Sequence, residues 1–159
     1  RRAAGFGMRV LAWNRSEREV AGVENVSLEE LLQRSDFVSV PVALTAETRH
    51  LLDAQRIASM KAGAVLVNTA RGGIVDELAL HEALSSGHIY AAGIDVFEQE
   101  PVAADNPLLQ HSNVVLAPHI GSATTLTRAR MADIAVDNAL AALSGEPMPY
   151  CVNPEVYPG

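Results

Sequence analysis

The sequence lacks several features that would point to particular protein classes. Its single cysteine, Cys151, excludes an internal disulfide and favours a reducing compartment. It has no signal-peptide pattern and no apolar run long enough to span a bilayer. Its net charge is -7 and its basic residues form no run, which disfavours a nucleic-acid platform. We therefore expect a cytoplasmic protein whose partners are neither nucleic acids nor membranes.

The composition and patterning that are present indicate an α/β protein. At 159 residues, with 48% hydrophobic and 19% charged residues, the chain can bury a proper core. Short apolar strands alternate with helices, which predicts a doubly wound parallel sheet. The expected strands are 8–13, 36–41, 65–67, 91–96 and 113–117. The helices are expected to begin after the N-cap residues Ser27, Asp53, Asp76 and Ser122.

The segment 64–77 is the centre of this pattern. The run 65–67 has no polar alternation, which suits a strand covered on both faces, and Gly72-Gly73 then turn the chain. Arg71 follows the carboxyl end of this strand, where open α/β sheets bind their ligands. Its guanidinium can hold a carboxylate by two hydrogen bonds, although a lone loop arginine is more often a surface residue.

Two other strand ends carry ionisable side chains. His119 directly follows the last expected strand, and an imidazole there can exchange a proton with a substrate. Glu98 and Glu100 follow strand 91–96, in which Gly93 is expected to allow a close backbone approach. An arginine, an acid and a histidine at one edge can together polarise a carbonyl beside a carboxylate. No metal site is predicted.

Three segments carry a family resemblance. Residues 68–77 (NTARGGIVDE), 93–101 (GIDVFEQEP) and 118–122 (PHIGS) resemble the signatures of the D-isomer-specific 2-hydroxyacid dehydrogenases, in the family's order and spacing. The resemblance covers nearly the whole chain. It implies a hydride-transferring enzyme that acts on a small 2-keto or 2-hydroxy acid, of the glyoxylate or hydroxypyruvate type.

The resemblance also implies roles for individual residues. Arg71 would bind the substrate, His119 would be the acid/base, and Glu100 rather than Glu98 would pair with His119. Asp95 would contact the nicotinamide carboxamide. It further implies that Thr69 and the backbone of Val40 and Pro41 line the cofactor cleft, with Ala70, His119 and Gly121 as additional cofactor contacts.

The family's domain arrangement implies a division of this chain. Residues 1–121 would be part of the cofactor-binding domain, and residues 122–159 a long helix and tail that return to the substrate domain. The apolar residues of this helix lie on more than one of its faces, which by itself predicts that the helix is wedged between layers. The family's first strand and glycine-rich loop are expected outside this sequence, because Gly5-Phe6-Gly7 precedes a strand instead of following one. We therefore expect these residues alone to be inactive. Members of the family are usually homodimers, so the resemblance also implies a homodimer.

The residues after strand 8–13 bear on the choice of cofactor. In dinucleotide folds this position normally supplies an acid to the adenosine ribose, whereas here Asn14-Arg15-Ser16 stand there. Arg15 can pair with a 2′-phosphate and Ser16 can donate to it, which favours NADP over NAD. The alternative is that Arg15 merely covers the adenine of NAD.

Two other functions remain open from the sequence. One is a nucleotide-binding regulatory module, like the corepressors that share the fold. The other is an oxidoreductase with the same three residues and another substrate, such as phosphite. Turnover of a 2-keto acid by the full-length protein would separate these possibilities.

Overall fold

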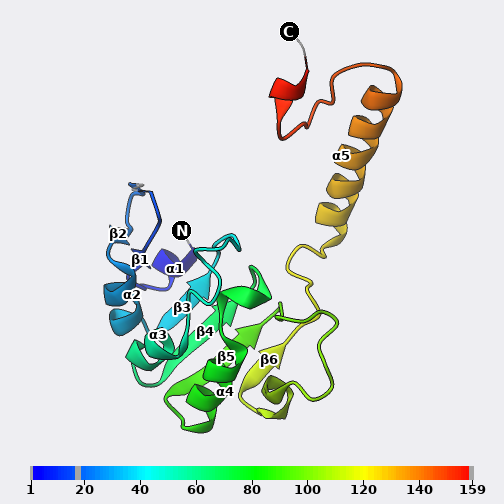
Figure 1. The fold of residues 1–159 in the computed structure, drawn as a ribbon. Coiled ribbons are helices and arrows are strands. Elements are labelled where there is room, and N and C mark those ends of the chain that lie inside the picture. The colour runs from blue at the N-terminus through cyan, green and yellow to red at the C-terminus, as the bar shows by residue number, and fades with distance from the viewer. Residues whose placement is uncertain (1, 17–18, 158–159) are drawn as a thin grey trace. The chain divides into compact units, whose positions relative to one another are not determined.

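The computed structural model describes residues 2–16 and 19–157, which form two units that divide between residues 119 and 120. The first unit contains a four-stranded parallel sheet in the order β3-β4-β5-β6 (Figure 1). Its strands are β3 (Phe37–Val40), β4 (Ala64–Asn68), β5 (Ile89–Ile94) and β6 (Val114–Leu116). The predicted α/β fold with a parallel sheet is confirmed. Because all four strands are parallel, their carboxyl ends share one edge.

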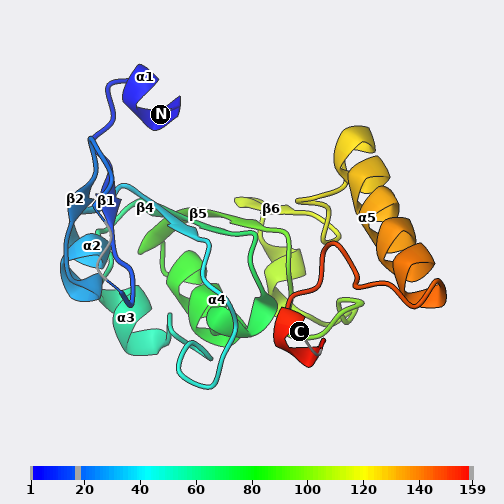
Figure 2. The same ribbon diagram turned by 90° about the horizontal axis from the view of Figure 1, so that it is seen from above.

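Three helices lie along the same face of this sheet, as Figure 2 shows. They are α2 (Leu28–Arg34), α3 (Ala54–Ser59) and α4 (Glu77–Ser85). The predicted N-caps are confirmed for all three: Ser27, Asp53 and Asp76 each accept hydrogen bonds from amides two or three residues on. Such bonds satisfy amides that the first turn leaves without partners.

The core lies between these helices and the sheet. Leu66 of β4, Leu80 of α4 and Ile89 of β5 are fully buried there. The opposite face includes Phe37, Tyr90 and Val115, which are exposed, and none of α2, α3 and α4 lies on that face of the sheet (Figure 2). The expectation that residues 65–67 are covered on both faces is therefore wrong for this chain. Burial alternates along β4 because only one face meets the helices.

The chain before α2 forms a small separate sheet. After α1 (Arg2–Gly5), β1 (Leu11–Ala12) pairs in parallel with β2 (Glu24–Asn25). The expected strand 8–13 is thus only two residues long, and its partner β2 was not predicted. Glu24 accepts hydrogen bonds from Arg34 at 2.9 Å and from Arg9 at 3.1 Å, so long-range polar contacts hold a strand with little apolar character.

The second unit consists of α5 (Thr125–Leu143) and a tail with the short helix η3 (Pro154–Val156). The N-cap is Thr124, which accepts from the Thr127 amide, and the predicted cap Ser122 is wrong. None of the helix residues is buried, and Leu126 and Leu143 are 85% and 86% exposed, so the predicted position between layers stays a prediction. No helix of the described residues combines the length and apolarity needed to cross a membrane.

Candidate active site

The loop after β4 is fixed by a buried amide. Asn68, 1% exposed at the end of the strand, accepts from the Ala70 amide at 3.1 Å and donates to the Arg71 carbonyl at 2.9 Å. Both bonds stay inside the loop, so they set the direction in which the chain leaves the sheet. Arg71 is exposed at this edge, with its guanidinium donating to the Ala70 carbonyl at 2.6 Å. The side chain is therefore accessible to an anion.

A glycine brings this loop against the one that follows β5. Gly72 opens the short helix η1 (Gly72–Ile74) and is buried. A β-carbon on Gly72 would lie 1.9 Å from the carbonyl carbon and oxygen of Phe97, closer than any nonbonded contact. By contrast, a β-carbon on Gly93 would meet only the Val67 methyls at 3.7 Å, so the close approach expected there occurs at Gly72 instead.

The structure brings Glu100 and His119 together. His119 Nδ1 lies 2.9 Å from Glu100 Oε2, and the Phe97 amide donates to the other carboxylate oxygen at 3.1 Å. An ionised carboxylate can only accept, so Nδ1 carries the proton and Nε2 is free to face a ligand. The hydrogen bond from His119, with that from Phe97, holds the pKa of the Glu100 carboxyl below its usual value. The charge of Arg71 acts in the same direction.

Backbone hydrogen bonds tie the three strand ends to each other. The Asp95 amide donates to the Asn68 carbonyl at 3.0 Å, and the His119 amide donates to the Asp95 carbonyl at 2.8 Å. His119 has a φ of 55°, a left-handed conformation that is uncommon outside glycine. Such outliers persist where the surroundings enforce them and are concentrated at functional sites.

An open cleft of about 630 Å³ adjoins Arg71. Its lining includes the predicted residues Pro41, Thr69 and Ala70. The sequence reasoning missed Val42, Ala43 and Leu44, although they follow Pro41 directly beyond the carboxyl end of β3. Among the described residues, no group of three or more His, Cys, Asp or Glu could hold a metal ion.

Comparison with known proteins identifies the family. Residues 1–121 match the sequence model of the D-isomer specific 2-hydroxyacid dehydrogenase, NAD binding domain. The chain belongs to this family. It is 52% identical over 160 residues to the glyoxylate reductase of Korarchaeum cryptofilum, an alignment that covers 98% of this chain and 48% of the relative. Glyoxylate/hydroxypyruvate reductase B of Salmonella newport is 52% identical over 155 residues, which cover 95% of this chain and 48% of the relative.

A solved structure extends the comparison to the fold. The NADPH-dependent glyoxylate/hydroxypyruvate reductase of Sinorhizobium meliloti, in complex with NADP and malonate, matches with a TM-score of 0.83 and 38% identity. The match covers 90% of this chain and 45% of that one. This dehydrogenase-family chain thus spans about half the length of the relatives it matches.

The remaining predicted cofactor residues of this dehydrogenase-family chain are not all gathered at the cleft. Asp95 is buried at the sheet edge, whereas the Val40 side chain lies in the core, so only its backbone can face the cleft. Gly121 belongs to the second unit. The segment Asn14-Arg15-Ser16 is exposed after β1. Glu47 follows the cleft residue Leu44 by three positions. The pKa of its carboxyl is lowered mainly by a hydrogen bond from Thr45, and the charge of Arg15 lowers it slightly further.

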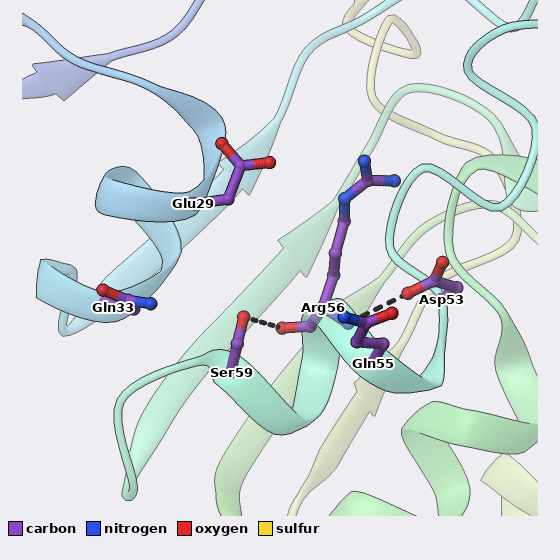
Figure 3. A pocket seen from close by; sticks show the side chains of 6 residues that line it. All are labelled: Glu29, Gln33, Asp53, Gln55, Arg56 and Ser59. Carbon is purple, nitrogen blue, oxygen red and sulfur yellow. Dashed lines mark hydrogen bonds between the residues drawn. The ribbon is translucent and has the colours of Figure 1, made fainter.

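A second cleft in this chain, of about 290 Å³, has a structural explanation (Figure 3). Its lining comes from α2 and α3 and the cap of α3. The residues are Glu29, Gln33, Asp53, Gln55, Arg56 and Ser59. Asp53 caps α3 by accepting from the Arg56 amide at 2.9 Å, and the Arg56 guanidinium donates to the Leu51 carbonyl at 3.1 Å. Asp53 and Arg56 thus serve the fold, and the cleft beside Arg71 is the candidate site.

Proposed function

We propose that the protein carrying this chain is an NAD(P)-dependent oxidoreductase that reduces a small 2-keto acid of the glyoxylate or hydroxypyruvate type. The observation that carries the proposal is the 2.9 Å contact between His119 and Glu100, at the strand edge where Arg71 is exposed. The names of the Korarchaeum and Salmonella relatives support this substrate class. In this proposal residues 122–159 belong to the substrate domain.

The cleft fits a nicotinamide ring and its ribose. Its wall from Pro41 to Leu44 is apolar, which suits one face of a flat ring, and the Thr69 hydroxyl offers a polar contact. Asp95 follows β5 at the same edge and would contact the carboxamide. When bound, the nicotinamide supplies the hydride that reduces the keto carbon.

The three ionisable residues supply substrate binding, proton transfer and orientation of the imidazole ring. Arg71 holds the substrate carboxylate with its planar guanidinium, which orients the neighbouring carbonyl. His119 gives a proton from Nε2 to the carbonyl oxygen, which becomes the hydroxyl of the product. Glu100 accepts from Nδ1–H, so it fixes the orientation of the ring and stabilises the cationic imidazole. In the oxidative direction His119 takes the proton back.

We further propose that NADP is preferred over NAD. Arg15 and Ser16 follow β1 and are exposed, so both can reach a 2′-phosphate, and Asn14 carries no charge that would repel one. The Sinorhizobium relative is described as NADPH-dependent, which agrees with this choice.

Steady-state kinetics on the intact protein test the proposal. Glyoxylate, hydroxypyruvate and pyruvate would each be offered with NADPH and with NADH, and phosphite with NADP and with NAD. We expect turnover of glyoxylate or hydroxypyruvate, with a higher kcat/KM for NADPH than for NADH. Turnover of phosphite alone would replace the proposed substrate class. Cofactor binding without turnover of any substrate would indicate a regulatory module.

A further inference from the structure

His50 occupies an unusual position beside the candidate site. It ends the turn that follows the cleft wall, and its amide donates to the Gly73 carbonyl at 2.8 Å. Its φ of 48° is left-handed, and His119 is the only other non-glycine residue with a positive φ in the described chain. A conformation of this kind costs energy and persists only when the surrounding contacts enforce it.

The His50 ring lies between two carboxylates. Its Nδ1 is 3.9 Å from Asp76 Oδ2, and its Nε2 is 3.3 Å from Glu98 Oε1. Nε2 is shielded from solvent, yet the contact with Glu98 is not aligned well enough to count as a hydrogen bond, and no other described residue supplies one. We therefore describe it as an electrostatic contact. A ring nitrogen removed from water in this way depends on its carboxylate neighbour.

The two carboxylates belong to the two loops that carry Arg71 and Glu100. On one side, residues 50–52 run alongside 73–76: the Leu52 amide donates to the Ile74 carbonyl, and the Asp76 amide donates to the Leu52 carbonyl, both at 3.0 Å. This segment supports η1, which begins immediately after Arg71.

On the other side, Glu98 precedes Glu100 by two residues. Its amide donates to Glu77 Oε1 at 2.6 Å, and its carboxylate accepts from the Glu77 amide at 3.3 Å. Glu77 also accepts from the side chain of Asn106 at 2.6 Å. These hydrogen bonds hold the loop of Glu100 to the start of α4. The His50 ring contacts the same loop through Glu98.

We propose that His50 is a positioning residue that fixes the Arg71 loop against the Glu100 loop through its contacts with Asp76 and Glu98. It touches neither substrate nor cofactor in this assignment. Its effect on turnover rests on the proposed function, whereas its effect on the two loops does not. The family resemblance assigns the contact with His119 to Glu100 and not to Glu98. In this proposal Glu98 has a separate role, as a contact of His50.

Two substitutions distinguish the effect of the His50 ring from that of the backbone conformation at this position. His50→Asn keeps a residue type that tolerates positive φ but is too short to reach both carboxylates. His50→Gln tests the same loss with a longer side chain. The matched control is His88→Gln, since His88 is a half-buried histidine whose Nε2 contacts the Ile57 carbonyl at 3.2 Å, away from the three strand ends.

Kinetics on the intact protein give the first readout. Because a displacement of about 1 Å can cost about 10²-fold in rate, we expect both His50 variants to lower kcat/KM for the keto acid by about 10- to 100-fold. The affinity for NADPH should change less than twofold, and His88→Gln should behave as wild type. Adding Glu98→Gln to His50→Asn should cause little further loss, because both remove the same contact.

Hydrogen exchange gives a readout that needs no activity. In His50→Asn, the amides of Ile74 and Phe97 should exchange faster together, because one lies in each loop. Faster exchange confined to residues 50–52 would overturn the proposal, as would kcat/KM within twofold of wild type in an active enzyme. If the wild-type protein turns over no keto acid, the proposed function fails, and the exchange of Ile74 and Phe97 still decides the role of His50.

Discussion

Replacing Gly72 by alanine is the sharpest test of how the site is assembled. The new β-carbon would lie 1.9 Å from the carbonyl carbon and oxygen of Phe97 and 2.4 Å from the Glu98 amide nitrogen. Nonbonded carbon atoms meet at about 3.5 Å, so the Phe97 peptide must retreat by roughly 1.5 Å. No side-chain rotation relieves this overlap, because the three nearest atoms all belong to the backbone.

The magnitude follows from this geometry. Overpacking costs about 1–3 kcal/mol, and a rigid backbone obstacle places Gly72→Ala at the upper end, near 3 kcal/mol of unfolding free energy. For a domain of this size that corresponds to a fall of about 6–12 °C in Tm. The same displacement moves Arg71 away from Glu100, and about 1 Å of misplacement costs about 10²-fold in rate.

Gly73→Ala is the matched control. The nearest atoms to its β-carbon would be side-chain atoms of Arg49 and Leu44, at 3.6 and 3.7 Å, and Gly73 has no positive φ. We expect it to be neutral or to stabilise the chain by about 0.4–1 kcal/mol through the unfolded state. Chemical denaturation and keto-acid kinetics would be measured for both variants. If the unfolding free energies of Gly72→Ala and Gly73→Ala differ by less than about 1 kcal/mol, the close packing of the two loops is refuted.

Three further predictions follow from individual side chains. His119→Ala should lower kcat by about 10²–10⁴-fold and weaken NADPH binding, followed by fluorescence, by a smaller factor; a loss of kcat below tenfold would remove His119 from the acid/base role. Arg15→Ala should reduce kcat/KM for NADPH more than for NADH, and equal losses would argue against a 2′-phosphate contact. Burial, aided by the charge of His81, lowers the pKa of His111, whose Nε2 lies 2.8 Å from His81 Nδ1. His111 takes up a proton near pH 6.5 in the unfolded chain and only at lower pH in the folded chain. The neutral His111 therefore leaves the free energy of unfolding at its full value above about pH 6.5, and this free energy declines as the pH falls below that value. Denaturation curves at pH 8 and pH 5.5 should show that His111→Gln reduces the acid-induced loss of stability, and an unchanged loss would contradict the assignment.

The local hydrogen bonds of this protein were readable from the sequence. Ser27, Asp53 and Asp76 cap their helices because a short polar side chain can reach an amide two or three residues on without help from the rest of the fold. The α5 cap shows the limit of this reasoning. Ser122 and Thr124 are both suitable residue types two positions apart, and the helix begins after Thr124. Composition and periodicity do not choose between two such neighbours.

The sequence by itself also determined which strand ends carry ionisable side chains, and so where the candidate site is predicted. Arg71, Glu100 and His119 each follow a strand closely, and parallel strands bring their carboxyl ends to one edge. Only the tertiary structure decided how these ends are held together. The pairing of Glu98 with Glu77, the ring of His50 and the contact between Gly72 and Phe97 join segments 21 or more residues apart. Contacts of that kind depend on the packing of whole elements, and no local pattern encodes them.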